Sequence, residues 1–72
     1  MQVKVNGRTI ELFSGAKVED ALRRYSRTEW RRVRDGERRV CDAHGHEVGL
    51  DGELAGGQEL ITSARVPKEP QP

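Results

Sequence analysis

Three kinds of feature are scarce in this chain, and each scarcity excludes a class of protein. The single cysteine, Cys41, excludes an internal disulfide framework, a four-cysteine zinc site and a cysteine-ligated iron–sulfur cluster. No run of apolar residues is longer than two, which argues against a membrane span and a signal-peptide core. Only Phe13, Tyr25 and Trp30 are aromatic, too few for a base-stacking platform. We therefore expect one small cytoplasmic domain.

Charge is abundant instead, and it is distributed unevenly along the chain. Charged residues make up 35% of the 72 residues, yet the net charge is only +1. Segment 23–39 holds eight arginines and three acidic residues, whereas segment 42–59 holds five acidic residues and no lysine or arginine. The two blocks either form solvated faces that partly pair with each other or attract charged partners.

The first thirteen residues predict a β-hairpin. Apolar and polar residues alternate along the first strand, as they do on a half-buried strand. Asn6-Gly7 is typical of a type I′ turn, because both central residues of that turn need positive φ. A two-residue turn there pairs the first strand with Arg8–Phe13 and places Val3 opposite Ile10.

Two helices are predicted after the hairpin. Segment 17–25 has an apolar stripe at i, i+3, i+4 and i+7, formed by Val18, Ala21, Leu22 and Tyr25. Ser26 and Glu29 match the S-x-x-E capping box, which predicts a second short helix that ends at Asp35. On this helix we expect Trp30 and Val33 to face the domain.

The rest of the chain is rich in turns and strands. Strands are expected over 38–42, 47–50 and 58–62, with the last strand parallel to the first. Residues 64–72 contain three prolines and predict a flexible tail. The order of elements indicates an α+β domain over residues 1–63, in which a mixed sheet of four or five strands packs on one main helix.

Three segments carry a resemblance to a known fold. Met1–Gly7, Leu12–Leu22 and Leu54–Leu60 resemble the ubiquitin-like β-grasp fold, in particular the small sulfur carriers of thiamine and molybdopterin biosynthesis. In that family a partner enzyme adenylates and then thiocarboxylates a C-terminal Gly-Gly pair. This sequence ends in Pro-Gln-Pro and its Gly56–Gly57 pair precedes the last strand, so we expect no residue to fill the reactive position.

The densest group of potential metal ligands is Cys41, Asp42, His44 and His46. Thiolate and imidazole bind zinc well, but Cys41 and Asp42 point to opposite faces of a strand, and the spacing matches no established zinc module. The favoured interpretation is a polar turn with two exposed histidines beside a small buried cysteine. A filled core in so short a chain leaves little room for a pocket. We expect no metal, no cofactor and no catalytic residue.

The arginine block provides the candidate partner site. Arg27, Arg31 and Arg34 share one face of the second predicted helix, and guanidinium groups suit bidentate contacts with carboxylate or phosphate. Trp30 either closes the core or anchors an interface. The predicted partner-binding residues are Arg23, Arg24, Arg27, Trp30, Arg31 and Arg34.

Three functions remain open from the sequence. The first is a monomeric, non-catalytic adaptor that binds an acidic protein surface. The second is a sulfur-carrier or modifier-like protein without a mature C-terminal Gly-Gly pair. The third is a weak nucleic-acid or anion binder that acts through the arginine-rich helix. A pI near 8.0 and the lack of an RNA-binding signature argue against nucleic acid.

Overall fold

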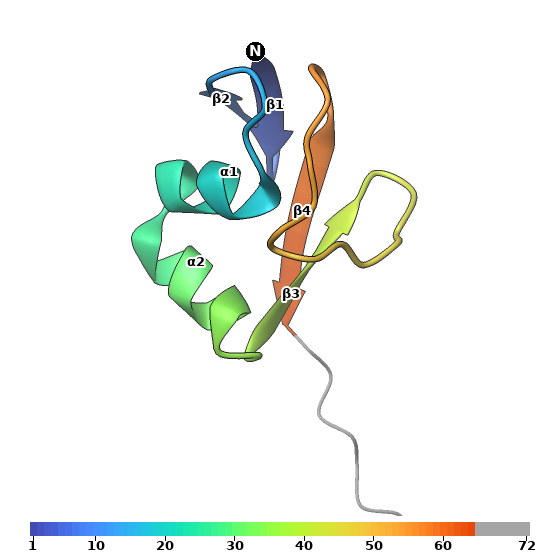
Figure 1. Cartoon of the computed structure of the whole chain (residues 1–72). Helices are drawn as coiled ribbons and strands as arrows, with labels where there is room; N and C mark the ends of the chain where they lie inside the picture. The colour runs from blue at the N-terminus through green and yellow to red at the C-terminus, as the bar shows by residue number, and fades with distance from the viewer. Residues whose placement is uncertain (65–72) are drawn as a thin grey trace, which may run out of the picture.

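The computed structural model describes residues 1–64, which form a sheet with two helices on one side (Figure 1). The elements in chain order are β1 (Gln2–Val5), β2 (Arg8–Glu11), α1 (Val18–Tyr25), α2 (Arg27–Arg34), β3 (Arg38–Asp42) and β4 (Glu59–Ala64). The predicted tail lies outside the described residues except for Ala64, which pairs with Arg38 and extends the last strand beyond its expected end.

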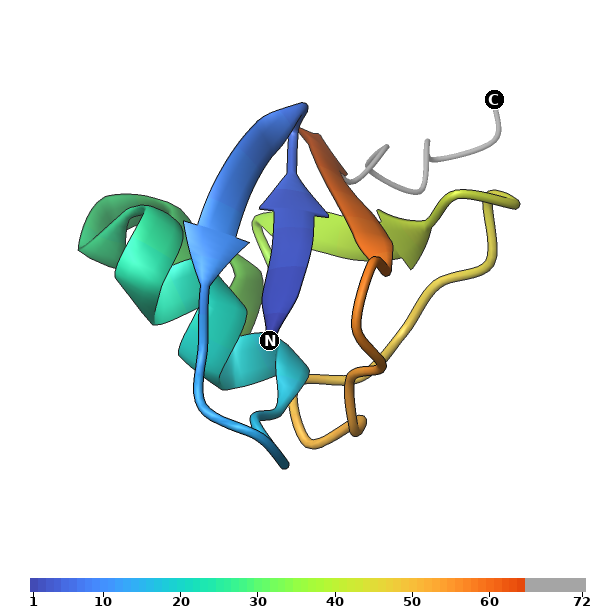
Figure 2. The ribbon, with the colours of Figure 1, turned by 90° about the horizontal axis from the view of Figure 1, so that it is seen from above.

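The four strands form one mixed sheet in the order β2-β1-β4-β3 (Figure 2). β1 pairs antiparallel with β2 and parallel with β4, and β4 pairs antiparallel with β3. The first and last strands are therefore neighbours at the centre of the sheet, with Val5 beside Leu60. The predicted parallel pairing of these two strands is confirmed.

The turn of the first hairpin has the predicted geometry. Asn6 has a φ of 53° and Gly7 a φ of 82°, as a type I′ turn requires. Val3 lies opposite Ile10, so both apolar side chains face the same side of the sheet. β2 ends at Glu11 rather than Phe13, and Phe13 lies in the loop that leads to α1.

The core lies between the sheet and α1. Its buried apolar side chains come from both hairpin strands, the loop after β2, α1, the loop before β4 and β4, and they include Val3, Val5, Ile10, Leu12, Val18, Leu22, Leu54 and Leu60. α1 packs against β1 and β2, whereas α2 packs against α1 and β3. α2 has no fully buried residue, so its place depends on the contacts at its ends and along one side.

The predicted fifth strand over 47–50 does not form. Only one isolated bridge, between Cys41 and Glu47, joins this segment to β3. The chain then turns toward α1, where the carbonyl oxygens of Leu50 and Gly52 accept the first two helical N–H groups at 2.9 Å each. These N–H groups have no partner within a helix, so the segment caps α1 instead of extending the sheet. Among the described residues, no helix is long and apolar enough to cross a membrane.

Candidate functional site

The start of α2 follows only half of the predicted capping box. The Ser26 hydroxyl accepts the N–H of Glu29 at 3.2 Å, as expected of an N-cap. The Ser26 N–H, however, donates to the carbonyl oxygen of Leu22 at the end of α1, at 2.8 Å. The Glu29 carboxylate is therefore released from the cap and can bind elsewhere.

Glu29 fastens α2 to the sheet through a polar network that the sequence did not reveal. Its Oε2 accepts the hydroxyl of Thr62 at 2.6 Å and the Nε of Arg38 at 2.5 Å. Thr62 is only 7% exposed, and its hydroxyl and N–H both bond to the Asn6 side chain at 2.9 Å. One network thus joins α2 to β3, to β4 and to the first hairpin turn, which fixes α2 relative to the rest of the domain.

Trp30 both closes the edge of the core and lies among arginines. It is half-buried and packs against the core together with Tyr25 and Val33. The guanidinium carbons of Arg23 and Arg34 lie 5.1 and 5.0 Å from the centre of its ring, within the range of cation–π contact. The position of Trp30 is therefore compatible with both roles considered from the sequence, closure of the core and anchoring of an interface.

Two of the candidate arginines already have partners. Arg34 is exposed, as its position on the predicted helix face requires, and its side chain lies over Trp30 and bonds through Nε to Asp35 at 3.0 Å. Arg23 pairs with Glu19 at 2.6 Å and with Asp20 at 3.5 Å. These ion pairs are local, and they leave less charge for a partner than the sequence indicates.

The remaining candidates form what we call the arginine face: Arg24, Arg27 and Arg31. All three are exposed, and within residues 1–64 none has a hydrogen bond or an ion pair. Arg32 is exposed and equally unpaired, but it is one residue further along and points about 100° away from Arg31. The arginine face therefore brings together three exposed cations that have no partner within residues 1–64.

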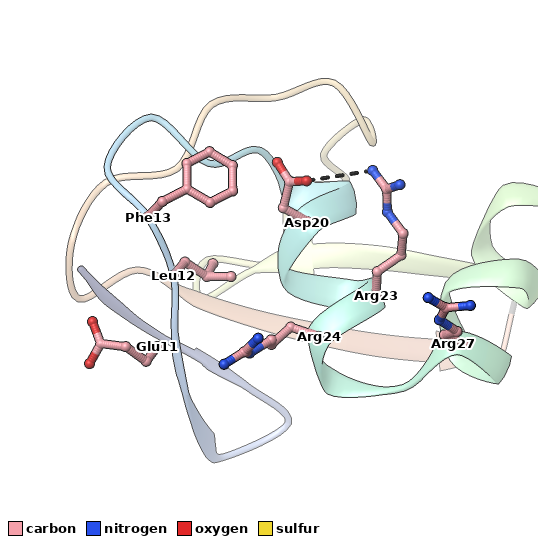
Figure 3. Close-up of a pocket in the computed structure, with 7 residues that line it drawn as sticks. All are labelled: Glu11, Leu12, Phe13, Asp20, Arg23, Arg24 and Arg27. Atoms are coloured by element: carbon pink, nitrogen blue, oxygen red, sulfur yellow. Dashed lines mark hydrogen bonds and ion pairs between the residues drawn. The ribbon is translucent and has the colours of Figure 1, made fainter.

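A groove of about 660 Å³ opens beside the arginine face (Figure 3). It lies between the loop that follows β2 and the exposed side of α1, and it ends at the start of α2. Phe13, 63% exposed, stands on its rim. The lining residues are Glu11, Leu12, Phe13, Asp20, Arg23, Arg24 and Arg27. Three of the predicted partner-binding residues thus meet in this groove, and Trp30, Arg31 and Arg34 lie outside its lining.

The acidic block does not neutralise the arginine face. Asp51 and Glu53 are exposed and Glu59 is half-buried, and none of the three forms an ion pair within the described residues. The expected partial pairing between the two charged blocks does not involve these side chains. Instead, Arg23, Arg34 and Arg38 form ion pairs with acidic residues of α1 or of the arginine-rich segment itself.

The turn after β3 contains the potential metal ligands, and its backbone N–H groups bond to one of them, Asp42. Asp42 Oδ1 accepts the backbone N–H groups of His46 and His44 at 3.0 and 2.8 Å, and these bonds lower the pKa of its carboxyl group. Both histidines are exposed, whereas Cys41 is buried on β3. Within residues 1–64 no three His, Cys, Asp or Glu side chains are grouped closely enough to hold a metal ion.

The Gly56–Gly57 pair forms an internal turn before β4. Gly57 has a φ of 82°, a value that L side chains rarely adopt. Its N–H donates to the carbonyl oxygen of Gln2 at 2.7 Å, which joins the turn to β1. The turn therefore explains why residue 57 is a glycine, and it gives the pair a structural role.

The mixed sheet, its strand order and the packed helix define a ubiquitin-like β-grasp fold. Among solved structures, the chain is similar to SAMP1 from Haloferax volcanii, a ubiquitin-like small archaeal modifier. The TM-score is 0.62 and the sequences are 23% identical, over 94% of this chain and 97% of that chain. No protein-family model and no curated protein sequence matches the chain.

Proposed function

We propose that this protein is a non-catalytic, ubiquitin-like interaction module that binds an anionic surface of a partner protein through the arginine face. The observation that supports this function most directly is the lack of any ion-pair partner for Arg24, Arg27 and Arg31 within the described residues. Guanidinium groups are well suited to carboxylates, and preformed positive charge accelerates encounter with an anionic partner.

The rigid attachment of α2 strengthens this proposal. The Glu29 network and the packing of Trp30 hold α2 against the sheet, so that Arg27 and Arg31 have a fixed backbone position. A fixed surface loses less entropy on binding than a mobile one.

Quantitative affinity capture from the native cells tests this function. The bait is the full chain, and the matched variant replaces Arg27 and Arg31 with glutamate. We expect the variant to fold normally, because exposed substitutions change stability by about 0.5 kcal/mol or less. We expect it to lose its specific partners by about tenfold or more, since repulsion replaces attraction. An unchanged set of partners at unchanged yield would reject the function.

A modifier or sulfur-carrier role is the second candidate, and the likeness in fold to SAMP1 favours it. This role requires activation of a terminal carboxylate. Intact-mass analysis after incubation with ATP and an activating enzyme of the source cells tests it. An adenylate or thiocarboxylate adduct supports the modifier role, whereas an unmodified mass supports the interaction module alone.

A further inference from the structure

We propose that the groove between the loop after β2 and α1 is a docking site for an acidic linear segment of the partner protein, with one apolar side chain of that segment packed against Phe13. This inference rests on the proposed function and assigns it a specific site and a specific partner chemistry. Its basis is the combination of an exposed aromatic side chain, a groove of defined size and unpaired cations along one wall (Figure 3).

The apolar part of the site is formed by two consecutive residues. Leu12 is 8% exposed and belongs to the core, so its visible surface forms a firm floor. Phe13, at 63%, is the most exposed large apolar side chain of the described residues. An apolar partner side chain placed here would remove aromatic surface from water, which favours binding in proportion to the area buried. The groove volume falls within the range of about 300–1,000 Å³ that is usual for binding pockets.

The charges along the walls favour an anionic partner. Glu11 accepts the side-chain amide of Gln2 at 3.2 Å, which lowers the pKa of Glu11 and keeps it ionised. Asp20 is engaged by the backbone N–H of Lys17 at 2.9 Å and pairs with Arg23. Arg24 and Arg27 therefore remain as the cations of the groove without a partner in residues 1–64.

This mixture of charges suits a peptide better than a nucleic acid. A peptide with acidic side chains offers carboxylates to Arg24 and Arg27, and its backbone N–H groups can donate to the Glu11 and Asp20 carboxylates. A phosphate backbone offers only acceptors there, so it has no group that can donate to the two carboxylates. The single exposed aromatic of the groove also falls short of the stacking surface that single-stranded nucleic acids use.

Titration of the ¹⁵N-labelled full chain with a synthetic peptide tests the site. The probe is a nine-residue peptide of Asp and Glu with one central Phe, and the control peptide has Ser in place of Phe. We expect saturable amide shifts centred on Leu12, Phe13, Arg24 and Arg27, with a dissociation constant below about 1 mM. The Ser peptide should bind at least about fivefold more weakly, because it cannot bury a side chain against Phe13.

Two charge-matched double variants locate the binding. Arg24→Glu with Arg27→Glu reverses both free cations of the groove, and we expect it to weaken binding by about tenfold or more. Arg8→Glu with Arg32→Glu makes the same change in net charge at exposed, unpaired arginines outside the groove, and binding should stay within about threefold of the parent. A Phe13→Ser variant keeps all charges and should lose the preference for the Phe peptide.

The outcomes separate this inference from the function on which it rests. No saturable shift, or equal losses in both charge variants, rejects the groove. Tighter binding of an oligothymidylate of equal charge to the same amides, or concentration-dependent shifts of the free protein there, rejects the acidic segment as occupant. If the groove is rejected while Arg27→Glu with Arg31→Glu still abolishes partner capture, the interaction function stands. If neither assay depends on these arginines, both proposals fail.

Discussion

At the scale of single residues, Leu22 and Leu60 are the largest fully buried side chains of the described residues. Leu22, at 0% exposure, lies on the face of α1 that contacts β1 and β2. The position was predictable because the apolar period of a helix is set by neighbours three and four residues away. The same local logic identified Asn6-Gly7, since the turn type depends on these two residues alone.

Leu22→Ala should lower the free energy of unfolding by about 2–5 kcal/mol, because it removes buried methyl groups and leaves a cavity. Urea denaturation followed by circular dichroism measures this change. Ile61→Ala is the control, since Ile61 is 43% exposed on the sheet and its loss should cost less than about 1 kcal/mol. Equal costs at the two positions would contradict the helix register described here.

Other residues could not be assigned from the sequence. Glu29 matched a capping box, but its carboxylate bonds to Thr62, 33 residues away, and a local pattern contains no information about such a partner. Arg34 fitted the solvent face by spacing, but its long side chain reaches Trp30. The contact between Arg34 and Trp30 could have been predicted from the sequence, because residues four positions apart are neighbours on a helix.

At the scale of elements, α2 is the part whose position is least determined by apolar packing. It buries no residue completely, and Thr62 and Glu29 supply the bonds that hold it to the sheet. The segment 47–50, predicted as a fifth strand, divides its backbone bonds between two elements: the Val48 N–H donates to Val40 of β3, and the Leu50 carbonyl oxygen accepts the Glu19 N–H of α1. The position of α2 and the path of segment 47–50 both depend on hydrogen bonds to elements that are distant in the sequence. The apolar periodicity of helices and strands does not predict such bonds.

Thr62→Val should destabilise the domain by about 1–3 kcal/mol, although it preserves side-chain shape and strand propensity. It removes a hydroxyl that donates to the Glu29 carboxylate and accepts from the Asn6 amide, so each of these partly buried hydrogen bonds is lost. Thr9→Val on the exposed side of β2 is the matched control, with an expected change within about 0.5 kcal/mol.

Hydrogen exchange gives a second readout of the same variant. The amides of α2 should lose protection in Thr62→Val to a greater extent than the amides of β1, because the network holds α2 in particular. Protection that falls uniformly over the domain would show that Thr62 contributes to global stability without fixing α2.

At the scale of the whole molecule, the two charged blocks of the sequence are only partly separated in space. α2 lies on one side of β3 and the loop 43–49 of the acidic block lies on the other, as both views show (Figures 1 and 2). Glu53 of the same block, however, bridges Lys17 at the start of α1, the helix that lines the groove. The sequence predicted the fold, whereas the groove required the positions of Phe13 and Arg27 in space.

The association rate constant of a captured partner tests the central claim most directly. The claim is that the arginine face guides an anionic partner to this domain. For the parent chain, the rate constant should fall by at least about fivefold between about 50 and 300 mM salt, because salt screens exposed charges. For Arg27→Glu with Arg31→Glu, it should be lower at low salt and should no longer decrease as salt is added. Identical rate constants and salt dependence for the two proteins would contradict the claim.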